Sequence, residues 1–164
     1  MPDPTSLEHL YDPEVFRTEG HKLVDALADS LKQSLAAEGP ARPFQDPDAA
    51  VAEWAKVFNS GSSQSEDLFA RWIEKAIKSH HPHTMGHQVG VTAPTSALAD
   101  LLGSLLDTGN GVFEVGNPAT AIERVIVKDL ARRMNLGSSA GGYLTSGGTL
   151  GSLTAMLAER PAWP

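Results

Sequence analysis

The spacing of apolar residues predicts helices throughout the first half of the chain. Between Glu14 and Glu38, leucines recur every four residues, which places them on one helical face. The apolar positions of this stretch are Phe16, Leu23, Val24, Leu27, Leu31 and Leu35. Gly39 and Pro40 predict its end, because glycine suits the position after a helix and proline cannot continue one.

Two further helices are expected before residue 80. Asp46 and Pro47 form a typical helix start, in which aspartate caps and proline occupies the first position. The stretch Asn59–Ser63 is the most linker-like in the chain. The apolar faces are Val51, Trp54, Ala55 and Phe58, then Leu68, Phe69, Trp72, Ile73, Ala76 and Ile77. We expect residues 1–79 to form a helical layer whose apolar stripes pack on each other or on a second subunit.

Helical periodicity continues in the second half, where glycine-rich turns separate the segments. Asn117 and Pro118 predict a capped helix start, and Asn135–Gly137 predicts its end. A short apolar piece, Tyr143–Leu144, precedes a glycine turn and a last helix from Leu150 to Glu159. The apolar positions before that turn are Leu98, Leu101, Leu102, Leu105 and Leu106, then Ile122, Val125, Ile126, Leu130 and Met134.

Composition narrows the class of protein. The 164 residues are 41% hydrophobic and 20% charged, a balance typical of globular domains. The net charge of -7 argues against nucleic-acid binding, which needs a surplus of Lys and Arg. The chain has no cysteine, no apolar run long enough to span a membrane, and no signal-peptide pattern at its start. We therefore expect a soluble, cytoplasmic protein.

The best candidate for chemistry is the glycine turn, which we define as Thr145–Ser152. Its glycines allow close approach of a ligand, and the helix that follows begins with unpaired N–H groups. This combination suits a phosphate at a helix N-terminus. The plainer alternative is a strand-to-helix turn with a Ser/Thr cap.

Four histidines between His80 and His87 invite a metal interpretation. However, Pro82 and Gly86 break the spacing, and no HExxH or Cys/His pattern supports zinc. We expect no metal site, but a loop that presents one or two imidazoles to a pocket.

Glu123 follows the predicted helix start at Asn117 and Pro118. It is either a first-turn carboxylate, favoured by the helix dipole, or a member of a buried ion pair. Paired catalytic carboxylates and a Ser-His-Asp arrangement cannot be assembled from this sequence.

Taken in order, these stretches resemble the group II pyridoxal-phosphate (PLP) dependent amino-acid decarboxylases over about residues 65–160. The family includes aromatic amino-acid, histidine, glutamate and diaminobutyrate decarboxylases. The matching motifs are His81-Pro82, Gly86-His87-Gln88, Leu98–Leu102, Glu114–Glu123 and Leu144–Arg160. The last of these resembles the family's phosphate signature, Thr-Ser-Gly-Gly-Ser/Thr followed by a helix.

The resemblance implies an α/β fold of type I, aminotransferase-like, with a mostly parallel sheet. This chain would be its N-terminal portion, mostly helical in itself, within a homodimer. Residues 1–79 would pack on the partner subunit, and residues 80–164 would begin the large PLP-binding domain. By carry-over, Gly148 and Thr149 would hold the PLP phosphate and Ser146 and Gly147 would shape the loop. The substrate pocket for an L-amino acid would be lined by His87, Gln88, Val89 and Gly90.

The family's catalytic residues would all lie downstream of this chain. They are the lysine that binds the cofactor, the aspartate on its ring nitrogen and the histidine stacked on its ring. Neither Lys128 nor any other lysine here lies in the matching motif. The resemblance thus implies a decarboxylase part that is inactive alone, and poorly soluble or oligomeric because half its sheet is missing. The ending Pro161-Ala162-Trp163-Pro164 fits a connection to further chain.

Two alternatives stay open at this point. The chain could be a non-catalytic interaction module descended from that family, which acts through its helical stripes. It could also be an unrelated helical domain that binds phosphate or metal.

Overall fold

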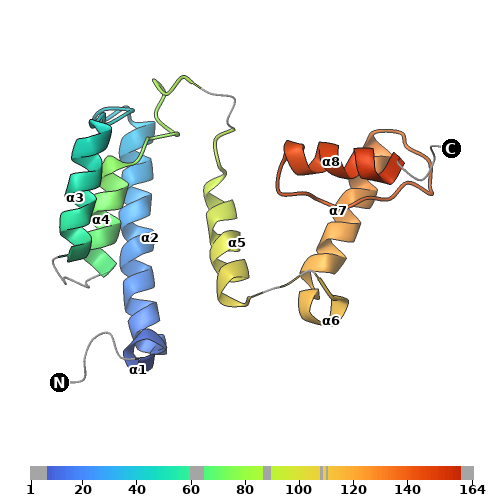
Figure 1. Cartoon of the computed structure of the whole chain (residues 1–164), viewed down its shortest axis with the longest axis horizontal. Helices are drawn as coiled ribbons and strands as arrows, with labels where there is room; N and C mark the ends of the chain where they lie inside the picture. The colour runs from blue at the N-terminus through green and yellow to red at the C-terminus, as the bar shows by residue number, and fades with distance from the viewer. Residues whose placement is uncertain (1–6, 60–64, 87–89, 108, 110, 160–164) are drawn as a thin grey trace. The chain divides into compact units, whose positions relative to one another are not determined.

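Helices make up all of the regular structure in the part of the chain that the computed structural model describes, namely residues 7–59, 65–86, 90–107, 109 and 111–159. The chain divides into two compact units, Met1–Val91 and Thr92–Pro164, which are described separately below. Figure 1 shows the order of the helices. They are α1 Leu7–Leu10, α2 Pro13–Leu35, α3 Pro47–Asn59, α4 Ser65–Lys75, α5 Pro94–Leu105, α6 Phe113–Gly116, α7 Ala119–Arg133 and α8 Gly148–Glu159.

The predicted mostly helical character is therefore confirmed for these ranges. No β-strand occurs within them, so the parallel sheet implied by the resemblance is absent from this part of the chain. The short apolar piece at Tyr143 and Leu144 is irregular rather than extended in a sheet. A strand requires a neighbouring strand to pair its N–H and C=O groups, and none lies beside this segment in the described residues.

The long first helix was predicted correctly, but its end was placed too late. Asp12 caps α2 by accepting a hydrogen bond from the Glu14 N–H at 2.8 Å. The helix ends at Leu35 rather than at Gly39, because Ala37 adopts a left-handed conformation with φ 57°. The Glu38 N–H then donates to the Gln33 carbonyl at 2.9 Å, which closes the helix end.

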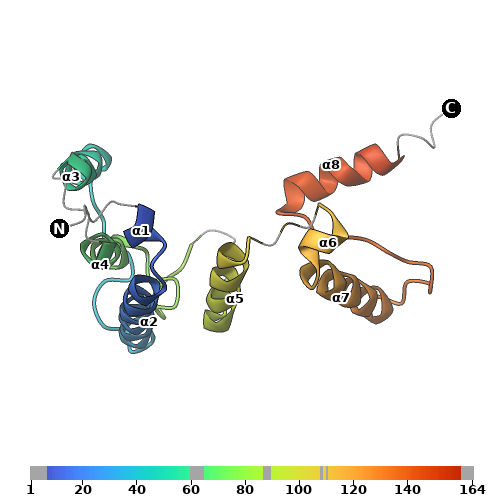
Figure 2. The same cartoon turned by 90° about the horizontal axis from the view of Figure 1, so that it is seen from below.

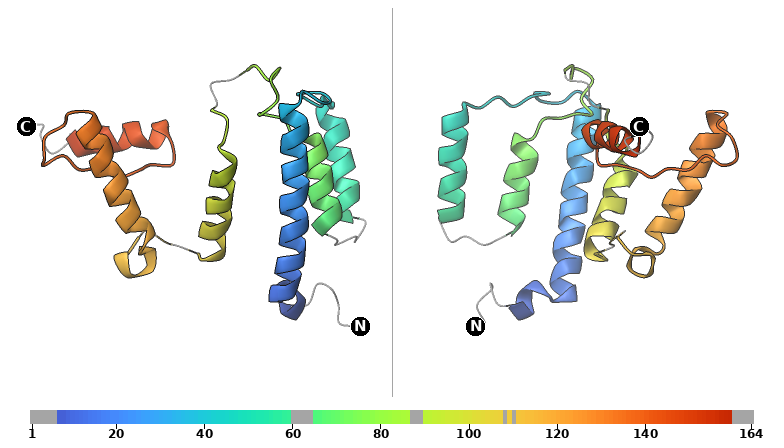
Figure 3. Two further views of the ribbon diagram at one scale, coloured as in Figure 1. Left: turned by 180° about the vertical axis from the view of Figure 1, so that it is seen from behind. Right: turned by 45° about the vertical axis from the view of Figure 1, so that its right-hand side comes forward.

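The start of α3 confirms the predicted aspartate cap. Asp46 Oδ1 accepts from the N–H groups of Asp48 and Ala49, both at 3.1 Å. Within this unit α4 packs against α2, and Figures 2 and 3 show α4 between α2 and α3. The predicted linker at Asn59–Ser63 lies, apart from Asn59 itself, outside the described residues.

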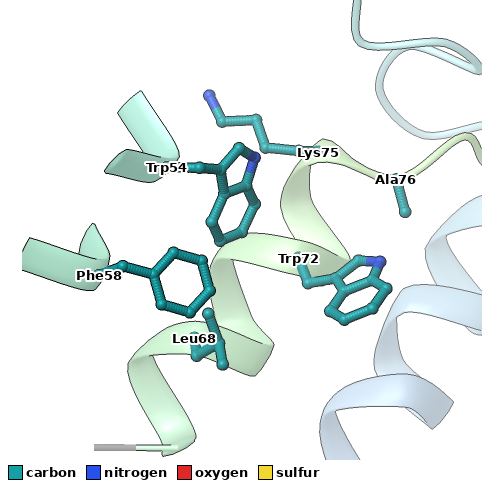
Figure 4. Close-up of a pocket in the computed structure, with 6 residues that line it drawn as sticks. All are labelled: Trp54, Phe58, Leu68, Trp72, Lys75 and Ala76. Atoms are coloured by element: carbon teal, nitrogen blue, oxygen red, sulfur yellow. The ribbon is translucent and has the colours of Figure 1, made fainter. Parts of the chain in front are cut away.

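An apolar cavity of about 430 Å³ lies between α3 and α4. Figure 4 shows Trp54 and Phe58 of α3 facing Leu68 of α4 across it. At its edge, Lys75 and Arg71 of α4 approach Glu53 Oε1 to 3.8 and 3.9 Å. Trp72, Lys75 and Ala76 complete the lining.

In the second unit, α5 confirms the helix expected from the periodicity between Leu98 and Leu106. The predicted cap at Asn117 is wrong, because Asn117 ends α6 and donates its N–H to the Phe113 carbonyl at 2.8 Å. Pro118 occupies the cap position of α7 and provides no side-chain cap.

Apolar side chains are exposed to an unusual degree for a globular chain. Among the described residues no apolar side chain is buried, and the buried residues are Ser34 and His81, at 4% exposed each, and Gly116. Folded domains ordinarily bury a contiguous apolar core. The apolar stripes predicted from the sequence therefore exist, and the described chain does not cover them.

No helix in the described ranges combines the length and the apolar character that crossing a membrane requires. The sequence predicted that residues 1–79 pack on a partner subunit and that residues 80–164 begin a cofactor-binding domain. Since these roles concern a partner subunit and a cofactor, this division of the chain stays a prediction.

Candidate functional site

The connection between α7 and α8 runs back along α7 and leads into the glycine turn (Figure 2). A Cβ placed on Gly142 would lie 3.5 Å from Val127 Cγ1. Two residues further on, the Leu144 N–H donates to Glu123 Oε1 at 2.7 Å. Glu123 and Val127 are four residues apart and share one face of α7. This face therefore fixes the course of the chain up to the turn.

The glycine turn leaves the first amides of α8 unpaired. The Gly151 N–H donates to the Gly147 carbonyl at 3.0 Å and closes the first turn of the helix. The Thr145 hydroxyl donates to the same carbonyl at 3.1 Å. The N–H groups of Gly148, Thr149 and Leu150 have no acceptor within the described part of the chain.

These amides meet the requirements of an anion site. A Cβ added to Gly147 or Gly148 would have no atom within 4 Å, so the turn is open to a ligand. The first turn of α8 carries no acidic side chain that would repel an anion. Free N–H groups and the positive end of the helix dipole both favour a phosphate there. The residues present thus fit a phosphate group.

The four predicted phosphate residues lie together. Ser146, Gly147, Gly148 and Thr149 are consecutive, exposed and located where α8 begins. Of the predicted pocket residues, His87, Gln88 and Val89 lie outside the described residues. Gly90 is described and exposed, and it belongs to the first unit. The roles of both sets stay predictions.

The histidine segment is organised around one buried ring. His81 is 4% exposed, and its Nδ1 accepts the His83 N–H at 3.1 Å. A neutral imidazole with an accepting Nδ1 carries its proton on Nε2, which is buried and has no partner. Such a nitrogen is a donor and does not bind a metal ion. No group of three His, Cys, Asp or Glu side chains in the described ranges could hold one.

Glu123 matches neither of its two predicted roles. Since α7 starts at Ala119, Glu123 lies beyond the first turn, and it forms no ion pair within the described residues. Instead it accepts the Leu144 N–H. Sequence patterns missed this contact because it joins residues 21 positions apart in the chain.

The pairing of carboxylates with basic residues explains the two shifted pKa values. The pKa of Glu53 is lowered, first by its hydrogen bond from Gln45 and further by Lys75 and Arg71. The pKa of Asp129 is lowered by hydrogen bonds from Arg132 and Arg133 on the same helix. Both carboxylates are half-buried members of ion pairs, and both lie outside the glycine turn.

Comparison with known proteins gives two relatives. Over 101 residues, or 61% of this chain, it is 27% identical to an L-2,4-diaminobutyrate decarboxylase of Acinetobacter baumannii. Over 102 residues, or 62% of this chain, it is 33% identical to a glutamate decarboxylase-like protein of Gibberella zeae. The matched regions are 20% and 19% of those proteins, so the chain spans about a fifth of the relatives' length. No family model and no solved structure matches it.

These matches make the chain similar to amino-acid decarboxylases over about 100 residues. They agree with the kind of enzyme that the motifs resemble.

Proposed function

We propose that this chain is the N-terminal part of a group II PLP-dependent decarboxylase of type I fold, which converts an L-amino acid to an amine and carbon dioxide. The observation that carries the proposal is the open turn at Gly148, whose free amides suit a phosphate. Two relatives with decarboxylase names and the order of the motifs support the same function.

In this proposal each part of the turn has a separate task. The N–H groups of Gly148 and Thr149 hold the cofactor phosphate, and Ser146 and Gly147 shape the loop around it. The residues His87, Gln88, Val89 and Gly90 line the substrate pocket. When bound, PLP supplies a ring that accepts the electron pair left by departing carbon dioxide, and the protein sets its orientation.

In this proposal the lysine that binds the cofactor belongs to a part of the protein outside these 164 residues. No lysine of these 164 residues occupies the family's cofactor-binding motif, so the segment alone is inactive. The enzyme is a cytoplasmic homodimer in which residues 1–79 pack on the partner subunit.

The test is a decarboxylation assay on the complete gene product that contains these residues. The relatives' names suggest L-2,4-diaminobutyrate and L-glutamate as first substrates, with amine and carbon dioxide measured. We expect PLP-dependent amine formation from the complete product and none from residues 1–164 alone. A complete product that never takes up PLP would refute the proposal.

The exposed apolar stripes favour one alternative, a non-catalytic interaction module derived from the same family. In that case the complete product would bind a partner through its helices and would neither bind PLP nor release amine.

A further inference from the structure

We infer that Glu123 is a positioning residue for the glycine turn, since its carboxylate fixes the backbone that leads into α8. The inference rests on the proposed function and names a residue of the same site. It is carried by one contact, the hydrogen bond that the Leu144 N–H donates to Glu123 Oε1 at 2.7 Å.

The location of Leu144 gives this contact its importance. Leu144 immediately precedes the turn, whose own internal bonds join Thr145 and Gly151 to the Gly147 carbonyl. These internal bonds shape the turn but do not attach it to the rest of the unit. The bond to Glu123 anchors the turn to α7, a helix of about four turns.

The carboxylate is available for this task. Although Arg124 and Lys128 lie on the same helix, Glu123 forms no ion pair within the described residues. Glu123 itself is half-buried, and its bond to the Leu144 N–H lies on the exposed surface of the unit. A bond between a backbone N–H and an ionised acceptor is stronger than one between neutral groups.

Thr145 and Gly151 approach each other closely within the glycine turn. A Cβ on Gly151 would lie 3.2 Å from Thr145 Oγ1, which is closer than ordinary van der Waals contact. Because Leu144 adjoins Thr145, a change in the anchor at Leu144 would alter the direction of the free amides. Loss of the Glu123 acceptor thus weakens phosphate binding without removing any ligand.

The experiment measures two properties of the 164-residue chain and its variants. The first is the dissociation constant of pyridoxine 5′-phosphate, which carries the phosphate but lacks the aldehyde that reacts with surface lysines. The second is hydrogen exchange in the peptide that contains Leu144. The variants are Glu123→Ala, which removes the acceptor, and Glu123→Gln, which keeps one. Glu114→Ala is the matched control, because Glu114 is exposed and its side chain forms no hydrogen bond or ion pair within the described residues.

We expect Glu123→Ala to weaken pyridoxine 5′-phosphate binding about tenfold, the usual effect of one lost hydrogen bond to a charged group. Exchange around Leu144 should become faster in the same variant. Glu123→Gln should stay within about threefold of the wild type, because its amide oxygen still accepts. Glu114→Ala should match the wild type in both measurements.

Two results separate the inference from the proposed function. If Glu123→Ala and Glu123→Gln both keep wild-type affinity and wild-type exchange, the positioning role is wrong while phosphate binding stands. If the wild type does not bind pyridoxine 5′-phosphate but exchange still depends on Glu123, the anchoring contact is supported and the phosphate function is refuted.

Discussion

Single residues determine whether the glycine turn can bind an anion. Gly148 is the first residue of α8, and its φ is not positive, so its conformation is open to other residue types. The amide of this residue, rather than the absence of a side chain, is what a phosphate requires. The same reasoning applies to Thr149, whose N–H is also free in the described chain.

Local chemistry made these residues predictable from the sequence. The first N–H groups of a helix have no partner within that helix, and glycines before it leave them open to a ligand. The contact between Glu123 and Leu144 was not predictable, because it depends on the path of the connection after α7. The tautomer of His81 could not be predicted from the sequence either, because it follows from a hydrogen bond that the loop geometry creates.

At the scale of elements, periodicity predicted the major helices and missed how some of them begin and end. The end of α2 was displaced because Ala37 takes the left-handed conformation that glycine usually supplies. The predicted cap of α7 was wrong because Asn117 is the C-cap of α6, a four-residue helix without a periodic pattern. Short elements of this kind depend on neighbouring contacts more than on their own sequence.

The pairing of α3 with α4 should depend on pH through Glu53. The hydrogen bond from Gln45, together with Lys75 and Arg71, lowers the pKa of Glu53 in the folded chain. Because the pKa of Glu53 is lower in the folded chain than in the unfolded chain, ionised Glu53 stabilises the folded state above the unfolded pKa of glutamate. This stabilisation is lost as the pH falls through the folded pKa. We expect the two helices to loosen on acidification within the carboxylate range.

Tryptophan fluorescence can follow this change. In a Trp163→Phe background, Trp54 and Trp72 report on the cavity between α3 and α4, and their emission should move to longer wavelength at low pH. Glu53→Gln should reduce that change, and Glu38→Gln, an exposed control, should not. An identical acid transition in all three proteins would contradict the role of Glu53.

For the whole molecule the dominant fact is uncovered apolar surface. Trp72 is 65% exposed and Phe58 is 72% exposed, and no apolar side chain in the described ranges is buried. Apolar area of this extent marks an interaction surface or a liability to aggregate. The sequence predicted the stripes through their spacing, but spacing does not specify what covers them.

We therefore expect the 164-residue chain to self-associate in solution. Sedimentation velocity should give a weight-average sedimentation coefficient that rises with protein concentration, because association buries the exposed faces. A single monomeric species over a hundredfold range of concentration would contradict this expectation.

The central claim is that the glycine turn offers its free amides to a phosphate, and one titration tests it most directly. Gly148→Pro removes one N–H at a helix position where proline is tolerated, whereas Gly148→Ala keeps the N–H and adds a methyl group in open space. We predict that pyridoxine 5′-phosphate binds Gly148→Pro at least about tenfold more weakly than the wild type, with Gly148→Ala within about twofold. Equal affinity of all three proteins, with helix content preserved by circular dichroism, would contradict the account.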